Sequence, residues 1–110
     1  MIFVTGPLFA GKKEYIRKAL GLSEAELRAC AVWDVQELAY GAELPALAEA
    51  LSKNEIVIAT EIGGGLVPID PQEREKREAA GRLACLLAER ADTVVRVSCG
   101  LGQILKGELP

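Results

Sequence analysis

The feature that most constrains the fold is a glycine-rich turn between a strand and a helix near the start of the chain. Apolar and β-branched residues precede Gly6, and residues with helical periodicity run from Lys12 to about Leu20. The spacing of Gly6, Gly11 and Lys12 fits the pattern G-x-x-x-x-G-K in this strand–turn–helix context. The sequence therefore predicts a P-loop that binds nucleotide phosphates. It consists of Gly6, Pro7, Leu8, Phe9, Ala10, Gly11, Lys12 and Lys13.

Such a loop has the parts that a phosphate chain requires. The glycines allow close approach of the backbone, N–H groups converge at the start of a helix, and Lys12 supplies a mobile positive charge. The alternative is a plain glycine turn with a solvated lysine. Because the spacing, the preceding strand and the following helix agree, we favour the phosphate-binding interpretation.

Lys13 departs from the usual P-loop pattern. This position normally offers a hydroxyl group to Mg²⁺, and an ammonium group cannot coordinate a cation. Three explanations stay open at this point. Water or a carboxylate replaces the hydroxyl, Lys13 adds a second positive charge to the phosphates, or the site binds nucleotide without transferring phosphate.

Two acidic residues follow predicted strands and are our candidates for catalysis and for binding Mg²⁺. Asp34 follows the apolar run at 30–33, and Glu61 follows the strand at 55–60, which is apolar on both faces. In parallel α/β sheets, ligands bind at the edge formed by the carboxyl ends of the strands. The alternative for each of the two is a helix cap or turn residue.

The rest of the chain alternates between strand and helix patterns. A capping box at Ser23 and Glu26 predicts a short helix, and Pro45 and Pro71 suit the first turns of two others. Strands separated by helices predict a three-layer α/β fold with a small parallel sheet, and we expect one domain spanning residues 1–110. We place the strands at 2–5, 30–33, 55–60 and 93–97, and the helices at 12–20, 23–29, 45–51 and 70–91.

Composition argues against two classes of partner. The net charge is −3, and lysine and arginine alternate with glutamate instead of forming a basic block, so we expect no nucleic-acid partner. No apolar run approaches the roughly 20 residues of a membrane span. Three scattered cysteines do not indicate a disulfide framework. We therefore expect a cytoplasmic protein.

Several segments together carry a more specific signature. The stretch from Ile56 to Pro68 is similar to an apolar strand followed by Asn-Glu-Val-Gly-x-Gly-Ile-Val-Pro, with Thr60 in place of the Asn. This signature resembles the bifunctional adenosylcobinamide kinase/adenosylcobinamide-phosphate guanylyltransferase family of cobalamin biosynthesis. Further similar segments lie at 2–15, 31–34, 77–83, 87–88, 91–94 and 97–101, with Lys106.

The resemblance implies a RecA-like P-loop NTPase fold, a homo-oligomer and two reactions. Such enzymes use ATP or GTP to phosphorylate the hydroxyl of the aminopropanol arm of adenosylcobinamide, and then transfer GMP to that phosphate. In this chain Lys12 would neutralise phosphate charge, and Asp34 or Glu61 would organise Mg²⁺. A corrinoid, cobinamide, would be the second substrate.

The chain also departs from this family. The family carries a histidine that receives GMP, and this sequence contains no histidine, so guanylyl transfer by that route is chemically excluded. Lys13 replaces the usual serine, Phe9-Ala10 replaces a basic–Ser pair, and Ala84-Cys85 replaces an Asn-Gln pair. We therefore expect a shortened member that binds ATP or GTP and acts as a kinase. The alternatives are a non-catalytic nucleotide-binding or assembly protein, and a kinase for another small alcohol.

Overall fold

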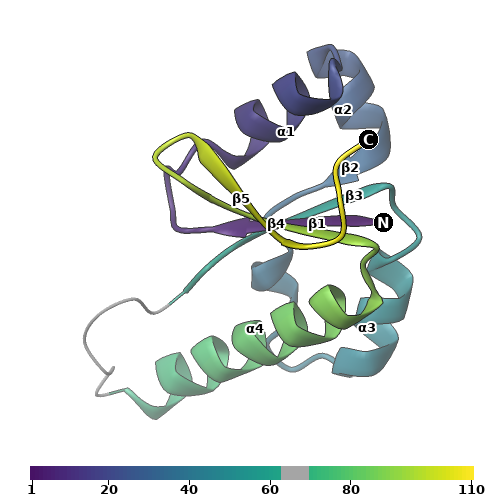
Figure 1. Cartoon of the computed structure of the whole chain (residues 1–110). Coiled ribbons are helices and arrows are strands. Elements are labelled where there is room, and N and C mark those ends of the chain that lie inside the picture. The colour runs from purple at the N-terminus through teal and green to yellow at the C-terminus, as the bar shows by residue number, and fades with distance from the viewer. Residues whose placement is uncertain (63–69) are drawn as a thin grey trace.

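The computed structural model describes residues 1–62 and 70–110, which form three layers with a sheet in the middle (Figure 1). Helices α1 (Lys12–Leu20) and α2 (Glu24–Cys30) cover one face of the sheet. Helices α3 (Leu44–Leu51) and α4 (Pro71–Arg90) cover the other face, preceded by the short 3₁₀-helix η1 (Val35–Leu38). The predicted α/β class, with a mostly parallel sheet flanked by helices, is confirmed.

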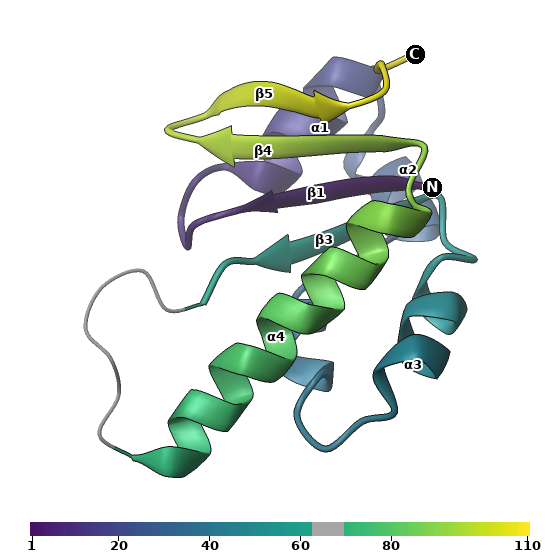
Figure 2. The same ribbon diagram turned by 60° about the horizontal axis from the view of Figure 1, so that its bottom comes forward.

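The sheet contains the four predicted strands and one further strand. In chain order they are β1 (Ile2–Gly6), β2 (Ala31–Val32), β3 (Ile56–Thr60), β4 (Thr93–Ser98) and β5 (Leu101–Lys106). Their order across the sheet is β2-β3-β1-β4-β5. The first four are parallel, and β5 is antiparallel to β4. Figure 2 shows β1 between β3 and β4. In this view α4 runs diagonally across the face of the sheet that it covers.

The prediction of four parallel strands missed β5. Ser98 pairs with Leu101, so only Cys99 and Gly100 connect β4 to β5. Both have positive φ, 53° and 73°, as a two-residue type I′ hairpin turn requires. This turn reverses the chain at once and makes β5 an antiparallel edge strand.

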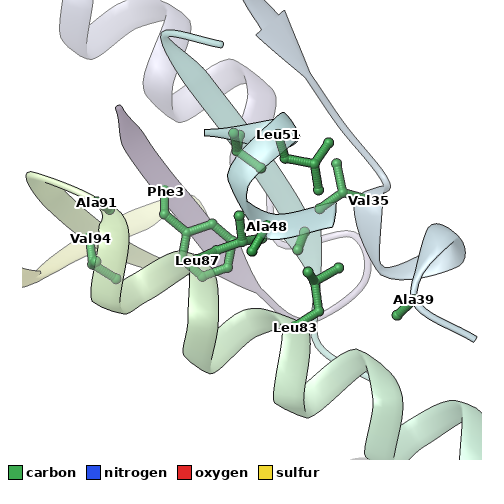
Figure 3. Packing of buried hydrophobic residues seen from close by; sticks show 11 residues of the cluster. Phe3, Val35, Ala39, Ala48, Leu51, Leu83, Leu87, Ala91 and Val94 are labelled. Atoms are coloured by element: carbon green, nitrogen blue, oxygen red, sulfur yellow. The ribbon is translucent and has the colours of Figure 1, made fainter. Parts of the chain in front are cut away.

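Two apolar clusters join the sheet to its helices. Along β1, Phe3 faces α3 and α4, whereas Val4 faces α1 and α2, as expected from the two-residue repeat of a strand. Figure 3 shows Phe3 close to Ala48 and Leu87, in the same cluster as Leu83. Each fully buried Leu or Ile contributes about 1.5–3 kcal/mol to stability. The two clusters hold β1 rigidly in the centre of the sheet.

The helix starts follow the sequence signals. Ser23 Oγ accepts a hydrogen bond from the N–H of Glu26, and the Glu26 carboxylate accepts one from the N–H of Ser23, so the predicted capping box is confirmed. Asp70 caps α4 by accepting from the N–H of Gln72 at 3.0 Å, with Pro71 at the first position. In the described part of the chain, no helix is long and apolar enough to cross a membrane.

One predicted element is shorter and more exposed than expected. The buried strand predicted at 30–33 is reduced to Ala31–Val32, and both residues are only half-buried. The reason is the position of β2 at the edge of the sheet, where it pairs only with β3. The three consecutive glycines at 63–65, part of the signature at 56–68, lie outside the described residues.

Candidate phosphate-binding site

All the predicted site residues follow the ends of parallel strands and so lie at one edge of the sheet. In Figure 1, β1 and β3 run toward this edge on the left. Gly6 is the last residue of β1, and the predicted loop leads from it into α1. Asp34 lies two residues beyond β2, and Glu61 directly follows β3. The fold therefore brings three segments that are distant in sequence to one edge of the sheet.

The backbone of the loop alternates in handedness. Phe9 and Gly11 have positive φ values, 59° and 83°, whereas Leu8 and Ala10 are not among the positive-φ residues. Alternation of this kind turns successive N–H groups toward one concavity, which is an arrangement that binds anions. Gly11 also caps α1, whose N-terminus adds the positive end of a helix dipole.

Neighbouring strands hold both ends of the loop. A Cβ atom on Gly6 would lie 2.1 Å from the carbonyl oxygen of Val97, so only glycine fits against β4 here. On the other side, the N–H of Glu61 donates to the Gly6 carbonyl at 2.8 Å. The N–H of Gly100 donates to the Ala10 carbonyl, also at 2.8 Å. The β4–β5 turn that the sequence analysis missed thus braces the loop.

Lys12 is a buried cation at the start of α1. Its side chain is folded under the loop, with Nζ donating to the Pro7 carbonyl at 2.7 Å, and the residue is 9% exposed. Burial lowers the pKa of Lys12, while the negative charges of Asp34 and Glu61 act in the opposite direction. A phosphate group placed over the loop would therefore meet a partly desolvated ammonium group.

A cavity of about 430 Å³ opens beside the loop. It brings together the predicted residues Lys12 and Asp34, with most of the loop. Glu61 does not line it. Sequence analysis missed Thr60, although its place at the end of a buried strand, next to Glu61, was a usable signal. The complete lining is Leu8, Phe9, Ala10, Gly11, Lys12, Lys13, Glu14, Asp34, Ile58 and Thr60.

Asp34 does not act as a helix cap through its side chain. It has a positive φ of 57° and precedes η1, but within this described segment its side chain accepts no hydrogen bond from that helix. Gln36 in η1 accepts a hydrogen bond from the N–H of Thr60 at 2.9 Å through Oε1. This bond ties the segment that carries Asp34 to the end of β3, across the cavity.

Glu61 is engaged by an arginine from another strand. Its two carboxylate oxygens accept from Nε and Nη2 of Arg96 at 2.7 and 2.9 Å, while Nη1 of Arg96 donates to Ser98 Oγ at 3.0 Å. The sequence analysis did not identify Arg96, whose only signal was a charge among the valines of strand β4. The carboxylate of Glu61 is therefore paired with a cation already.

The residues present suit Mg²⁺ that arrives with a nucleotide. Among residues 1–62 and 70–110 there is no cluster of three His, Cys, Asp or Glu side chains that could hold a metal alone. Mg²⁺ commonly uses one or two protein oxygens, with phosphates and water completing its shell. Asp34 and Thr60 line the same cavity as Lys12 and offer such oxygens.

The sequence matches the family model described as cobinamide kinase / cobinamide phosphate guanyltransferase over residues 19–105. The match begins after the predicted P-loop, so it is independent of residues 6–13. No curated protein matches the chain. The family model nevertheless covers most of the sequence. The chain therefore belongs to the cobinamide kinase / cobinamide phosphate guanyltransferase family, whose members use nucleoside triphosphates in cobalamin biosynthesis.

Proposed function

We propose that this single domain binds ATP or GTP at residues 6–13 and transfers the terminal phosphoryl group to the hydroxyl of the aminopropanol arm of cobinamide. The observation that carries the proposal is the buried ammonium of Lys12 beneath a loop of alternating handedness. Membership of the cobinamide kinase family supplies the acceptor.

In this proposal the protein acts through position and charge. The N–H groups of the loop and the N-terminus of α1 hold the phosphates, and Lys12 leaves the Pro7 carbonyl to meet them. Bound Mg²⁺ would neutralise phosphate charge, with Asp34, which lines the cavity, as the first candidate to hold it and Glu61 as the second. Burial of Lys12 strengthens its interaction with an anion, because fewer water molecules screen the charge.

We propose that the second reaction of the family is absent. In the family, GMP is received by a histidine, and the sequence contains no histidine, so this route of guanylyl transfer is closed. Cobinamide phosphate would then be the end product. A separate guanylyltransferase would be needed to continue from it.

A specific observation favours one other function, that of a non-catalytic nucleotide-binding protein. Lys13 stands where a hydroxyl normally meets Mg²⁺, and its ammonium group lies over the ring of Trp33. A site that lacks this ligand could bind phosphates and still transfer them poorly. A kinase for a different small alcohol is the remaining alternative.

Steady-state release of ADP or GDP, with and without cobinamide, separates these functions. We expect cobinamide-dependent turnover, and mass spectrometry should detect cobinamide phosphate but no GDP-cobinamide. Lys12→Ala should abolish turnover, whereas Lys18→Ala, which removes an exposed cation of the same helix, should not. Nucleotide binding without turnover would establish the non-catalytic function. Turnover that occurs only with another alcohol would show that this alcohol, and not cobinamide, is the acceptor.

A further inference from the structure

The ion pair between Glu61 and Arg96 crosses over the strand that leads into the P-loop. β1 lies between β3 and β4, and Thr5 of β1 is in register with Arg96. Glu61 follows β3 on the other side of β1 and is anchored by its N–H to the Gly6 carbonyl. The pair thus spans three strands directly beside the first residue of the loop.

The location of Glu61 creates an electrostatic problem. Its negative charge acts on Lys12, opposing in part the larger effect of burial, which lowers the pKa of that lysine. An unrestrained glutamate could turn toward the ammonium group and compete with the phosphates of a nucleotide. Both carboxylate oxygens are instead bound by the planar guanidinium fork of Arg96, a geometry that a lysine cannot reproduce.

We propose that Arg96 is a positioning residue that holds the carboxylate of Glu61 away from Lys12 and keeps this lysine available to phosphate. Ser98 supports the arrangement by accepting a hydrogen bond from the third nitrogen of the guanidinium group. Arg96 acts through Glu61 and does not contact the nucleotide. The inference rests on the proposed nucleotide-binding function and adds a residue to the same site.

Dissociation constants for ATP and GTP test this role in Arg96→Met, Glu61→Gln and the double variant. Arg96→Met should weaken binding roughly tenfold, within the range of coupling seen between contacting residues. The double variant should differ in affinity from Glu61→Gln by less than about twofold, because Glu61→Gln leaves no carboxylate for Arg96 to restrain. Arg96→Lys should fall between wild type and Arg96→Met, since it keeps the charge but loses the fork.

Two controls separate this role from a general loss of structure. Arg90→Met removes an exposed arginine at the end of α4 and should leave affinity unchanged. Thermal denaturation of each variant shows whether the fold is retained. Equal losses from Arg96→Met in the wild-type and Glu61→Gln backgrounds, or no loss in either, would overturn the role of Arg96 alone. Failure of the wild-type protein to bind nucleotide would instead overturn the proposed function, and the role of Arg96 with it.

Discussion

The ammonium group of Lys13 lies 4.4 Å from the centroid of the Trp33 ring. A cation over the face of an indole is attracted to it by about 0.5–1 kcal/mol at an exposed site. Lys13 also lines both the cavity beside the loop and a second cavity of about 260 Å³ that includes Trp33. Lys13 therefore stands between the cavity of the candidate site and its neighbour, with its ammonium group over the Trp33 ring.

Restoring a hydroxyl at this position should make nucleotide binding more dependent on metal. We expect Lys13→Ser to increase the stimulation of ATP binding by Mg²⁺ about tenfold, or ~1.4 kcal/mol, because serine can coordinate the ion and ammonium cannot. Titration calorimetry with and without Mg²⁺ measures the effect. Lys18→Ser on the exposed side of the same helix is the matched control. An unchanged response of Lys13→Ser to Mg²⁺ would show that the metal does not approach residue 13.

Nucleotide affinity should decrease with rising pH, and the decrease should begin below the pKa of an exposed lysine. Burial lowers the pKa of Lys12 in the free protein, and a bound phosphate would raise it again by favouring the charged form. Binding is then strongest below the free-state pKa and weakens as pH rises through it. The dissociation constant of the wild type should therefore increase between about pH 7 and pH 10. A wild-type affinity that does not change over this range would contradict the assignment.

The same shift has a consequence for stability, with the opposite dependence on pH. The folded-state pKa of Lys12 lies below the unfolded value, so charging the buried amine opposes folding. The free energy of unfolding should therefore rise, relative to Lys12→Met, as pH increases through the folded-state pKa. Urea denaturation at several pH values measures this difference. If the free energy of unfolding of the wild type instead fell relative to Lys12→Met as pH increased, the lowered pKa of Lys12 would be contradicted.

Two glycine-to-alanine substitutions should have opposite effects on stability. At Gly6, with φ 154° and Val97 O at 2.1 Å from the added Cβ, alanine should cost about 2–4 kcal/mol. At Gly81, inside α4, an added Cβ has no neighbour within 4 Å among the described residues. Alanine there should stabilise the fold by about 0.5–1 kcal/mol. Urea denaturation of both variants is the measurement, and a Gly6→Ala variant as stable as wild type would refute the close contact with β4.

Most of the fold could be predicted because its signals are local. The capping box at Ser23 and the Asp70-Pro71 start of α4 are each specified within four residues. β5 was missed because residues 101–106 show no clean alternation and are exposed throughout. The available signal was Gly100 in the turn that it forms with Cys99, since glycine suits the positive φ of the second central residue of a type I′ turn.

The candidate site is open to prediction where it lies within one segment and not where it depends on strand order. Residues 6–13 are contiguous, so their spacing alone predicts a P-loop, and this assignment stays a prediction. The contact between Glu61 and Arg96 joins residues 35 positions apart. It depends on the strand order β3-β1-β4, which places the two residues on either side of β1. The orientation of Lys13 toward Trp33 likewise depends on how α1 packs beside the end of β2.

Titration calorimetry of ATP and GTP with the wild-type protein and Lys12→Ala, each with and without Mg²⁺, tests the central claim most directly. The account predicts saturable binding by the wild type that Mg²⁺ enhances, and loss of that binding in Lys12→Ala. Equal affinity of the two proteins, or no binding by a correctly folded wild type, would contradict the assignment of residues 6–13 as a phosphate-binding loop.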